Sequence, residues 1–260
     1  TKMNLNSSKL KKLKSITKNK GMDFICSVFD LASLNLLKKI GVDAYKIASS
    51  DLTNHLLISK IKMTNKPIII STGMSSEKEI KKVLNLVNKK KVFLLHCVSM
   101  YPCKPKLANL GRILSLKKKF KVPIGYSDHT IGINACIEAL NLGAEIIEKH
   151  FTLNSSNNFG DHKFSAEPDL LKFLTDYNKS RKLYIGTGRI FPSNEESKFI
   201  KFYRKGIYLK ENTNKNTTIK EENIKFIRHQ KGLKSEDYKS ILGKKLKLNL
   251  KKNTLLKKKY

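Results

Sequence analysis

The stretch KPIIIST, residues 66–72, is a short apolar run that is rich in β-branched residues and ends in two hydroxyl side chains. Near-continuous apolar character is typical of a strand that is covered on both faces, as strands of parallel sheets are. Runs of this kind recur along the chain and predict six strands: DFICSVF (23–29), AYKIAS (44–49), KPIIIST, KVFLLHC (91–97), KVPIGYS (121–127) and AEIIEKHFT (144–152).

Segments with helical spacing of apolar residues separate these runs. Gly41 and Gly143 lie where two of these helices are expected to end. Strands that alternate with helices favour a parallel sheet built from βα units. The apolar positions that carry the helical spacing are Leu31, Leu34, Leu37 and Ile40, then Ile80, Val83, Leu84 and Val87, then Ile133, Ile137 and Leu140.

Polar residues gather at the carboxyl end of one predicted strand after another. An open sheet would use fewer strands to bind a ligand at one switch point, so this spread favours an α/β TIM (β/α)8 barrel. Six strands do not make eight, and SSKLKKLKSITKNKG (7–21) has the pattern of the helix before the first visible strand. We therefore expect a barrel that lacks about two N-terminal βα units.

The pattern changes after the predicted helix LLKFLTDYNKSRKLYIG (170–186). We expect a partial barrel over residues 1–188, a linker over 189–203 and a small β-rich domain over 204–260. A module of this size is near the lower limit for a domain that folds alone.

The charge of the chain is strongly positive, at +32, but only five of its 53 basic residues are arginine. Nucleic-acid-binding modules usually cluster their charge and use arginine for bidentate contacts. The lysines here are spread over nearly every segment, which favours a lysine-rich solvated surface over a nucleic-acid partner. A basic polyanion-binding protein is the alternative, and it predicts binding that weakens steeply with salt.

The four cysteines lack CxxC spacing, which favours reduced structural thiols in a cytoplasmic protein. No apolar run reaches 18 residues, so we expect neither a membrane span nor a membrane partner. The cysteines are Cys26, Cys97, Cys103 and Cys136.

Two histidines follow consecutive predicted strands, His129 in GYSDHTIG (125–132) and His150 in EKH (148–150). Ends of adjacent strands lie about 4.8 Å apart, so both imidazoles can reach one point. Imidazole is a common ligand of divalent metals, and two of them leave positions open for a substrate. The alternative is that His129 caps the next helix and His150 packs beneath it.

Lys46 lies inside a predicted strand, between apolar neighbours, where a charge is costly unless it has an anionic partner. It can bind a phosphate or carboxylate, or form a Schiff base as aldolase lysines do. Hydroxyls at nearby strand ends suit the first role, namely Ser49, Ser71, Thr72 and Ser127.

Several motifs together resemble the sialic acid synthases, which condense phosphoenolpyruvate with an N-acylated amino sugar to make nine-carbon (nonulosonic) acids. The resemblance runs from about residue 8 to the end, and the C-terminal part is similar to the SAF (antifreeze-like) domain of that family. The motif DHKFSAEP (161–168) favours the N-acetylneuraminate and N,N'-diacetyllegionaminate branch. The other motifs are AYKIASSD, KPIIISTGMSS, LLHCVSMYP, IGYSDHTIG and IEKHFT.

The resemblance implies a role for each matching residue. His129 and His150 hold a divalent metal, Mn2+ or Mg2+. Glu148 is two residues before His150 on the same strand face, so we expect it near the metal or its water. Asp51 supplies the carboxylate near the sugar, and Arg228 reaches the active site of the partner subunit in a homodimer. The residues implied to bind the two substrates are Lys46, Ser49, Ser71, Ser99 and Ser127 for phosphoenolpyruvate, and Tyr101 and Asp161 for the amino sugar.

The chain departs from the family pattern at two of these positions. Ser99 stands where the neuraminate enzymes often have asparagine, and RHQKG (228–232) replaces RPGNG around Arg228. The upstream strands that would carry another glutamate and a phosphoenolpyruvate lysine are not in this sequence. Besides the synthase, a Schiff-base aldolase that uses Lys46 and an inactive fragment remain as interpretations.

Overall fold

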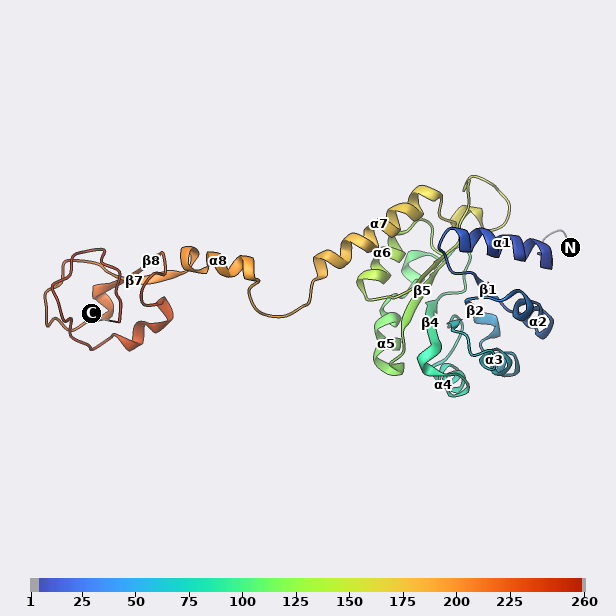
Figure 1. Cartoon of the computed structure of the whole chain (residues 1–260), viewed down its shortest axis with the longest axis horizontal. Coiled ribbons are helices and arrows are strands. Elements are labelled where there is room, and N and C mark those ends of the chain that lie inside the picture. The colour runs from blue at the N-terminus through green and yellow to red at the C-terminus, as the bar shows by residue number, and fades with distance from the viewer. Residues whose placement is uncertain (1–4, 259–260) are drawn as a thin grey trace. The chain divides into compact units, whose positions relative to one another are not determined.

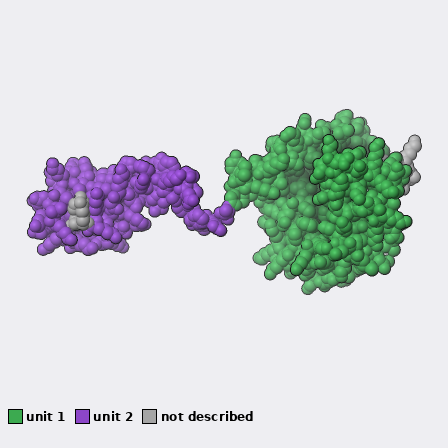
Figure 2. Space-filling view, in the orientation of Figure 1, with its two compact units in different colours: residues 1–186 green, residues 187–260 purple. Residues whose placement is uncertain are grey.

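The computed structural model describes residues 5–258, so the ends of both expected domains, residues 1–4 and 259–260, lie outside the described residues. The chain divides between Gly186 and Thr187 into two compact units, which Figure 2 shows in green and purple. Each unit has its own hydrophobic core.

The first unit contains one parallel sheet in which the strands follow chain order, β1 to β6. All six predicted strands are present, and each is shorter than the apolar run that predicted it. Their bounds are β1 (Ile25–Ser27), β2 (Ala44–Ile47), β3 (Ile68–Ser71), β4 (Val92–Cys97), β5 (Ile124–Asp128) and β6 (Ile147–Lys149).

A helix follows or precedes each strand, and Figure 1 shows α2 to α5 on the outer side of the sheet. Local capping sets the helix bounds: Ser76 and Glu79 form a capping box at the start of α4, and Gly41 ends α2 with a φ of 78°. The helices are α1 (Ser7–Asn19), α2 (Leu31–Ile40), α3 (His55–Lys62), α4 (Glu77–Leu86), α5 (Gly111–Phe120), α6 (Asn134–Asn141) and α7 (Pro168–Ile185).

The two faces of the sheet carry different side chains because residues alternate along each strand. The helix-facing side contributes Ile47, Ile70 and Leu94 to the main core. The opposite, inner side carries only a small apolar cluster around Ala44, Ile69 and Leu95, with polar residues beyond it toward the strand ends.

Side chains of β2 and β6 meet across the inner side of the sheet although three strands lie between these two, which shows that the sheet is curved. Lys46 Nζ lies 3.4 Å from Glu148 Oε1. Four interstrand steps in a flat sheet would span about 19 Å. The expected TIM-like α/β architecture is therefore confirmed for the described strands. Among these strands, β1 and β6 are at the edges of the sheet, and each pairs on one side only.

The second unit begins with α8 (Asn194–Tyr203), which lies within the segment 189–203 that we expected to be a linker. β7 (Lys205–Leu209) and β8 (Ile224–Arg228) then form an antiparallel pair. The core beneath this pair contains Ile207, Leu209, Ile219, Ile224, Leu233, Ile241, Leu246 and Leu256.

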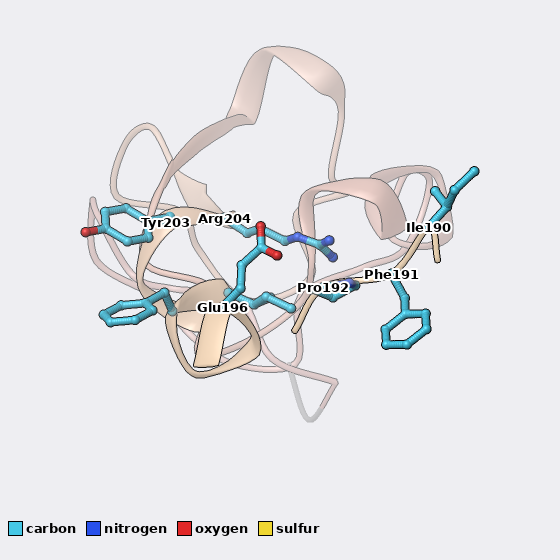
Figure 3. A pocket seen from close by; sticks show the side chains of 8 residues that line it. Ile190, Phe191, Pro192, Glu196, Tyr203 and Arg204 are labelled. Atoms are coloured by element: carbon cyan, nitrogen blue, oxygen red, sulfur yellow. The ribbon is translucent and has the colours of Figure 1, made fainter. Parts of the chain in front are cut away.

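A groove in this unit is formed by α8 and the segment that precedes it. In the view of Figure 3, Glu196 and Arg204 lie between Tyr203 on one side and Ile190 and Phe191 on the other. None of the site residues that the sequence predicts lines this groove.

All four cysteines are free thiols, as the sequence predicts, although Cys26 is only partly buried. Within residues 5–258, no helix is both long enough and apolar enough to cross a membrane.

Candidate active site

The candidate site lies on the inner side of the curved sheet, at the carboxyl ends of β2 to β6. The register places Cys97 beside Ser127, and Ser127 beside Glu148, so residues far apart in sequence share this side. In barrels of βα units, this end of the sheet is where active sites are built.

The structure brings the two predicted metal ligands together. His129 follows β5, His150 follows β6, and their ring centroids are 5.3 Å apart. His129 Nδ1 lies 3.0 Å from the carbonyl oxygen of Val98. Because a carbonyl only accepts, this nitrogen carries the proton and the other, Nε2, keeps its lone pair when the ring is neutral. His150 Nδ1 lies 3.4 Å from Asp161 Oδ2, so a carboxylate faces the same ring position in the second histidine.

The two imidazoles differ in their electrostatic surroundings. Burial is the largest influence on both and favours the neutral form. In His129 the hydrogen bonds with Cys97 and the Val98 carbonyl outweigh burial, so its pKa lies above the ordinary value. In His150 burial outweighs the attraction of Asp161, so its pKa lies below the ordinary value. His150 is therefore the ring that is readily available as a neutral ligand.

Two aromatic rings enclose the histidine pair. The ring centroid of Tyr101 lies 4.1 Å from that of His129, and the centroid of Phe164 lies 5.0 Å from that of His150. Burial raises the pKa of the Tyr101 phenol, so it stays protonated as a hydrogen-bond donor. The sequence reading missed Phe164, although it lies inside the quoted motif DHKFSAEP.

Cys97 is a site residue that the sequence reading treated as structural. Its Sγ lies 3.9 Å from His129 Nδ1 at the end of β4. Burial opposes its ionisation, but hydrogen bonds with His129, Ser49 and Ser127 outweigh burial and lower the pKa of the thiol. Alternate residues of a strand face the same side of the sheet, so Cys97 shares the inner side with Leu95. This alternation is the signal in the sequence that could have identified Cys97.

Lys46 points into the site from β2 and has an anionic partner, as its position in a strand requires. Its side chain is buried, and Nζ contacts Glu148 Oε1 at 3.4 Å and the Ile47 carbonyl at 3.1 Å. The side chain of Glu148 is 41% exposed, so a substrate can reach the charged pair.

Serine hydroxyls gather around the backbone of Gly73, which follows β3. Ser49 Oγ accepts a hydrogen bond of 3.0 Å from the Gly73 N–H. A Cβ at Gly73 would lie 2.4 Å from Ser99 Oγ and 2.7 Å from Ser49 Oγ, so the three loops approach closely. Ser71 Oγ and Ser99 Oγ are buried without a hydrogen-bond partner. Buried hydroxyls are normally paired, and these two are suited to bind oxygen atoms of an anion.

The role of Asp128, between Ser127 and His129, is clear from its contacts. It faces away from the site, and it bonds to Tyr126, Thr130, Cys136 and Lys149 but not to the His129 ring. Asp128 is therefore neither the acceptor that orients His129 nor the N-cap of the next helix, which is Ile133.

The described side-chain contacts of two other predicted site residues are with their own neighbours. Asp51 lies at the end of a 3-10 turn, Ser49–Asp51, and accepts a hydrogen bond from the Ser50 hydroxyl. Arg228 belongs to the second unit, where its guanidinium lies 5.7 Å from the ring centroid of Tyr203. Asp161, which we expected near the sugar, lies beside His150.

The donor set fits a divalent ion that is held by two imidazoles. In the described part of the chain, no group of three or more His, Cys, Asp or Glu side chains is arranged to hold a metal. His129 and His150 can supply two ligands through Nε2, with the remaining positions left for water or substrate. The second partner of each ring at Nδ1 is the usual way in which proteins orient such ligands.

A curved parallel sheet of βα units with charged and hydroxyl groups at its strand ends defines a (β/α)-barrel type of enzyme site. The chain belongs to the NeuB family, whose sequence profile matches residues 1–189. Residues 204–259 match the SAF domain.

Known relatives agree with this family. N,N'-diacetyllegionaminic acid synthase of Campylobacter jejuni is 38% identical over 238 residues, which are 90% of this chain and 71% of that protein. Pseudaminic acid synthase of Helicobacter pylori is 38% identical over 235 residues, 88% of this chain and 68% of that protein. The crystal structure of N-acetylneuraminic acid synthetase from Leptospira borgpetersenii in complex with citrate superposes with a TM-score of 0.72 at 38% identity, covering 76% of this chain and 70% of that one.

Proposed function

We propose that the chain is a synthase that condenses phosphoenolpyruvate with an N-acylated amino sugar, giving a nonulosonic acid and phosphate. Membership of the NeuB family and the names of its relatives support this reaction class. The observation that carries the proposal is the convergence of buried Lys46, two unpaired serine hydroxyls and two imidazoles at one end of the sheet.

The proposed reaction forms one carbon–carbon bond and, at C2 of phosphoenolpyruvate, replaces the bond to the phosphate oxygen with a bond to the oxygen of water. C3 of phosphoenolpyruvate attacks the aldehyde carbon of the open-chain sugar, and the aldehyde oxygen takes up a proton. Water adds to C2 of the resulting cation and gives up a proton. The tetrahedral intermediate then loses phosphate, which leaves the keto group of the product.

The anionic substrate is held by charge and hydroxyl groups in this proposal. Lys46 Nζ binds the carboxylate or phosphate of phosphoenolpyruvate, and the hydroxyls of Ser71 and Ser99 donate to its oxygens. Ser49 and Ser127 complete the wall next to them, in contact with Cys97. Holding the two reactants in attack geometry lowers the barrier by removing the entropic cost of their encounter.

His129 and His150 hold a divalent ion in this proposal, Mn2+ or Mg2+, and such an ion supplies Lewis-acid polarisation of the sugar aldehyde. The neutral His150 ring offers Nε2 for that purpose, and His129 offers its Nε2 once its ring is neutral. Glu148 Oε1 holds the Lys46 ammonium and accepts the proton of the water that adds to C2. The Tyr101 ring, packed on His129, forms a wall for the sugar together with Asp161.

The resemblance that implies a partner-subunit role for Arg228 and a carboxylate role for Asp51 extends the proposal to a homodimer. In this arrangement the guanidinium of Arg228 contacts the substrate of the partner subunit, and Asp51 contacts the amino sugar. Light scattering on the full chain tests the dimer, since a monomer at micromolar concentration would contradict it.

Phosphate release tests the proposed reaction. The chain is incubated with phosphoenolpyruvate, Mn2+ and, in separate arms, N-acetylmannosamine or a diacetamido-trideoxyhexose of the legionaminic or pseudaminic type. We expect release with one sugar class, its loss in EDTA and its recovery with added Mn2+. His129→Ala should lower the rate by roughly 10³-fold, whereas the control His55→Ala, an exposed residue at the start of α3, should leave it unchanged.

The same samples separate the synthase from a Schiff-base aldolase. An aldolase would be trapped as a covalent adduct on Lys46 by borohydride and would keep its activity in EDTA. Either result, or full activity of His129→Ala, contradicts the proposed function.

A further inference from the structure

A buried ion pair lies directly behind the two histidines. Asp128 precedes His129 and Lys149 precedes His150, and the two residues are register partners on β5 and β6. Lys149 Nζ lies 2.7 Å from Asp128 Oδ2, and the two side chains are 2% and 0% exposed. Strand alternation directs this pair to the helix-facing side and the histidines to the inner side.

Lys149 also bonds to the residue on the other side of His129. Its ammonium donates both to Asp128 Oδ2 and to the carbonyl oxygen of Thr130. Asp128 Oδ1 in turn accepts from the Thr130 N–H at 2.9 Å. His129 is therefore held between two residues that are both tied to Lys149, the neighbour of His150.

The carboxylate of Asp128 has its remaining bonds satisfied as well. Tyr126 OH donates to Oδ1 at 3.0 Å, and Cys136 Sγ donates to Oδ2 at 3.2 Å from α6. A buried ion pair adds little to stability compared with an apolar pair of similar size, because both charges lose their water. A fully bonded pair at this position instead fixes one geometry.

The position of β6 gives such a fixing contact a role. Among the described strands, β6 pairs only with β5, and its three residues are only partly buried. Its ladder with β5 is thus its only pairing with another described strand. Directly after β6, the His150 carbonyl accepts a hydrogen bond of 2.7 Å from the Ala166 N–H, so the ion pair lies between this contact and the ladder.

We infer that Asp128 and Lys149 are positioning residues that set the distance between the His129 and His150 rings and thereby create the two-imidazole metal site. This inference rests on the proposed function, in which both rings hold one ion. It does not require either residue to touch the metal or the substrates.

The experiment compares four forms of the full chain: wild type, Lys149→Met, the double variant Asp128→Asn/Lys149→Met, and Cys136→Ala. Lys149→Met leaves the Asp128 charge buried and unpaired, so it can lower stability by itself. The double variant removes both charges and restores a neutral, hydrogen-bonding side chain at 128, so its thermal unfolding should return close to that of the wild type. Cys136→Ala is the matched control because it removes a bond to the same oxygen without releasing β6.

Two measurements report the positions of the two imidazole rings and not the stability of the fold. Mn2+ titration followed by the electron paramagnetic resonance signal of the free ion gives the metal affinity. NOEs between ring protons of 13C-labelled histidines report the His129–His150 approach without any metal. We expect the double variant to be folded, to bind Mn2+ about tenfold or more weakly and to lose the ring NOE, while Cys136→Ala matches the wild type in both.

The outcomes separate this inference from the proposed function. Wild-type Mn2+ affinity together with a retained ring NOE in the folded double variant overturns the positioning role and leaves the proposed function standing. If wild type and His129→Ala bind Mn2+ equally, the proposed metal site is wrong, and the NOE comparison alone then decides whether the ion pair positions the rings.

Discussion

Lys46 Nζ lies 3.4 Å from Glu148 Oε1, although three strands separate β2 from β6. This contact shows that the inner side of the sheet is a concave surface on which opposite strands face each other. It also places one buried cation beside one partly exposed anion where a substrate would enter. The charge of each partner should therefore affect anion binding in opposite directions.

Lys46→Met should remove most of the affinity for phosphoenolpyruvate. The apolar side chain fills similar volume but leaves the anion without its buried counter-charge, so we expect binding to weaken by roughly 100-fold. Isothermal titration calorimetry measures the effect. Lys14→Met is the matched control, because Lys14 Nζ also bonds to a backbone carbonyl, that of Ile40, but lies outside the site.

Glu148→Gln should have the opposite effect on the same binding. The change keeps the shape of the side chain and removes a negative charge that repels the incoming anion and occupies Lys46. We expect phosphoenolpyruvate to bind severalfold more tightly while turnover falls. Weaker binding in this variant would show that Glu148 contacts the substrate favourably, contrary to the assigned role.

Gly73→Ala should distort the serine cluster. The added Cβ would lie 2.4 Å from Ser99 Oγ and 2.7 Å from Ser49 Oγ, so both hydroxyls have to move. Overpacking of this kind costs about 1–3 kcal/mol of stability, and the displaced hydroxyls should weaken phosphoenolpyruvate binding about tenfold. Urea unfolding and calorimetry measure the two effects.

Gly111→Ala is the control for the Gly73 variant. A Cβ at Gly111 meets nothing within 4 Å, and the residue begins α5. We expect unchanged binding and equal or slightly greater stability. If Gly73→Ala and Gly111→Ala had equal stability and bound phosphoenolpyruvate equally well, the close approach of the serine side chains to Gly73 would be contradicted.

Local patterns in the sequence were sufficient to predict the six strands of the first unit, five of its helices and the two histidines, whereas α8 lies in the segment that we expected to be a linker. Apolar runs of β-branched residues marked all six strands, and glycines marked the ends of α2 and α6. These features depend on neighbours within a few residues, which is why one sequence reveals them. The strand-end location of His129 and His150 followed directly from the strand assignment.

Contacts across the sheet could not be predicted in this way. The pairing of Lys46 with Glu148 depends on sheet curvature, and that of Asp128 with Lys149 on register and on which side each residue faces. Cys97 looked like any buried thiol until the structure placed His129 beside it. A polar residue in an apolar run signals that it needs a partner, but the fold decides which one.

The two units should respond separately to core substitutions. Leu94 is fully buried in the core of the first unit, and Leu209 is fully buried in that of the second. Truncation of a buried leucine to alanine costs about 2–5 kcal/mol. We expect Leu94→Ala to lower only one transition in differential scanning calorimetry and Leu209→Ala only the other. A single transition that both substitutions shift equally would contradict two independent cores.

Asp43 gives the first unit a stability contribution that depends on pH. Its Oδ2 accepts a hydrogen bond of 2.7 Å from the Phe24 N–H and lies 2.7 Å from Lys18 Nζ, which ties α1 to the loops around β1. The Lys18 ammonium, followed by the Phe24 N–H, lowers the pKa of this carboxyl below its ordinary value. The folded state therefore favours the ionised form.

The sign of the pH effect follows from that lowered pKa. The carboxylate stabilises the fold fully above the pKa of the unfolded chain, near 3.9, and this stabilisation is lost as pH falls through the lower pKa of the folded state. Asp43→Asn should thus lower the free energy of unfolding by roughly 1 kcal/mol at pH 7, since solvent screens part of the interaction. The difference from wild type should shrink as pH falls below about 4, measured by urea unfolding between pH 3 and 7.

Asp23→Asn is the control, because Asp23 is 77% exposed and 3.5 Å from the same lysine, and it should change stability little at any pH. A deficit of Asp43→Asn that stays constant down to pH 3 would show that the charge of Asp43 is not its source.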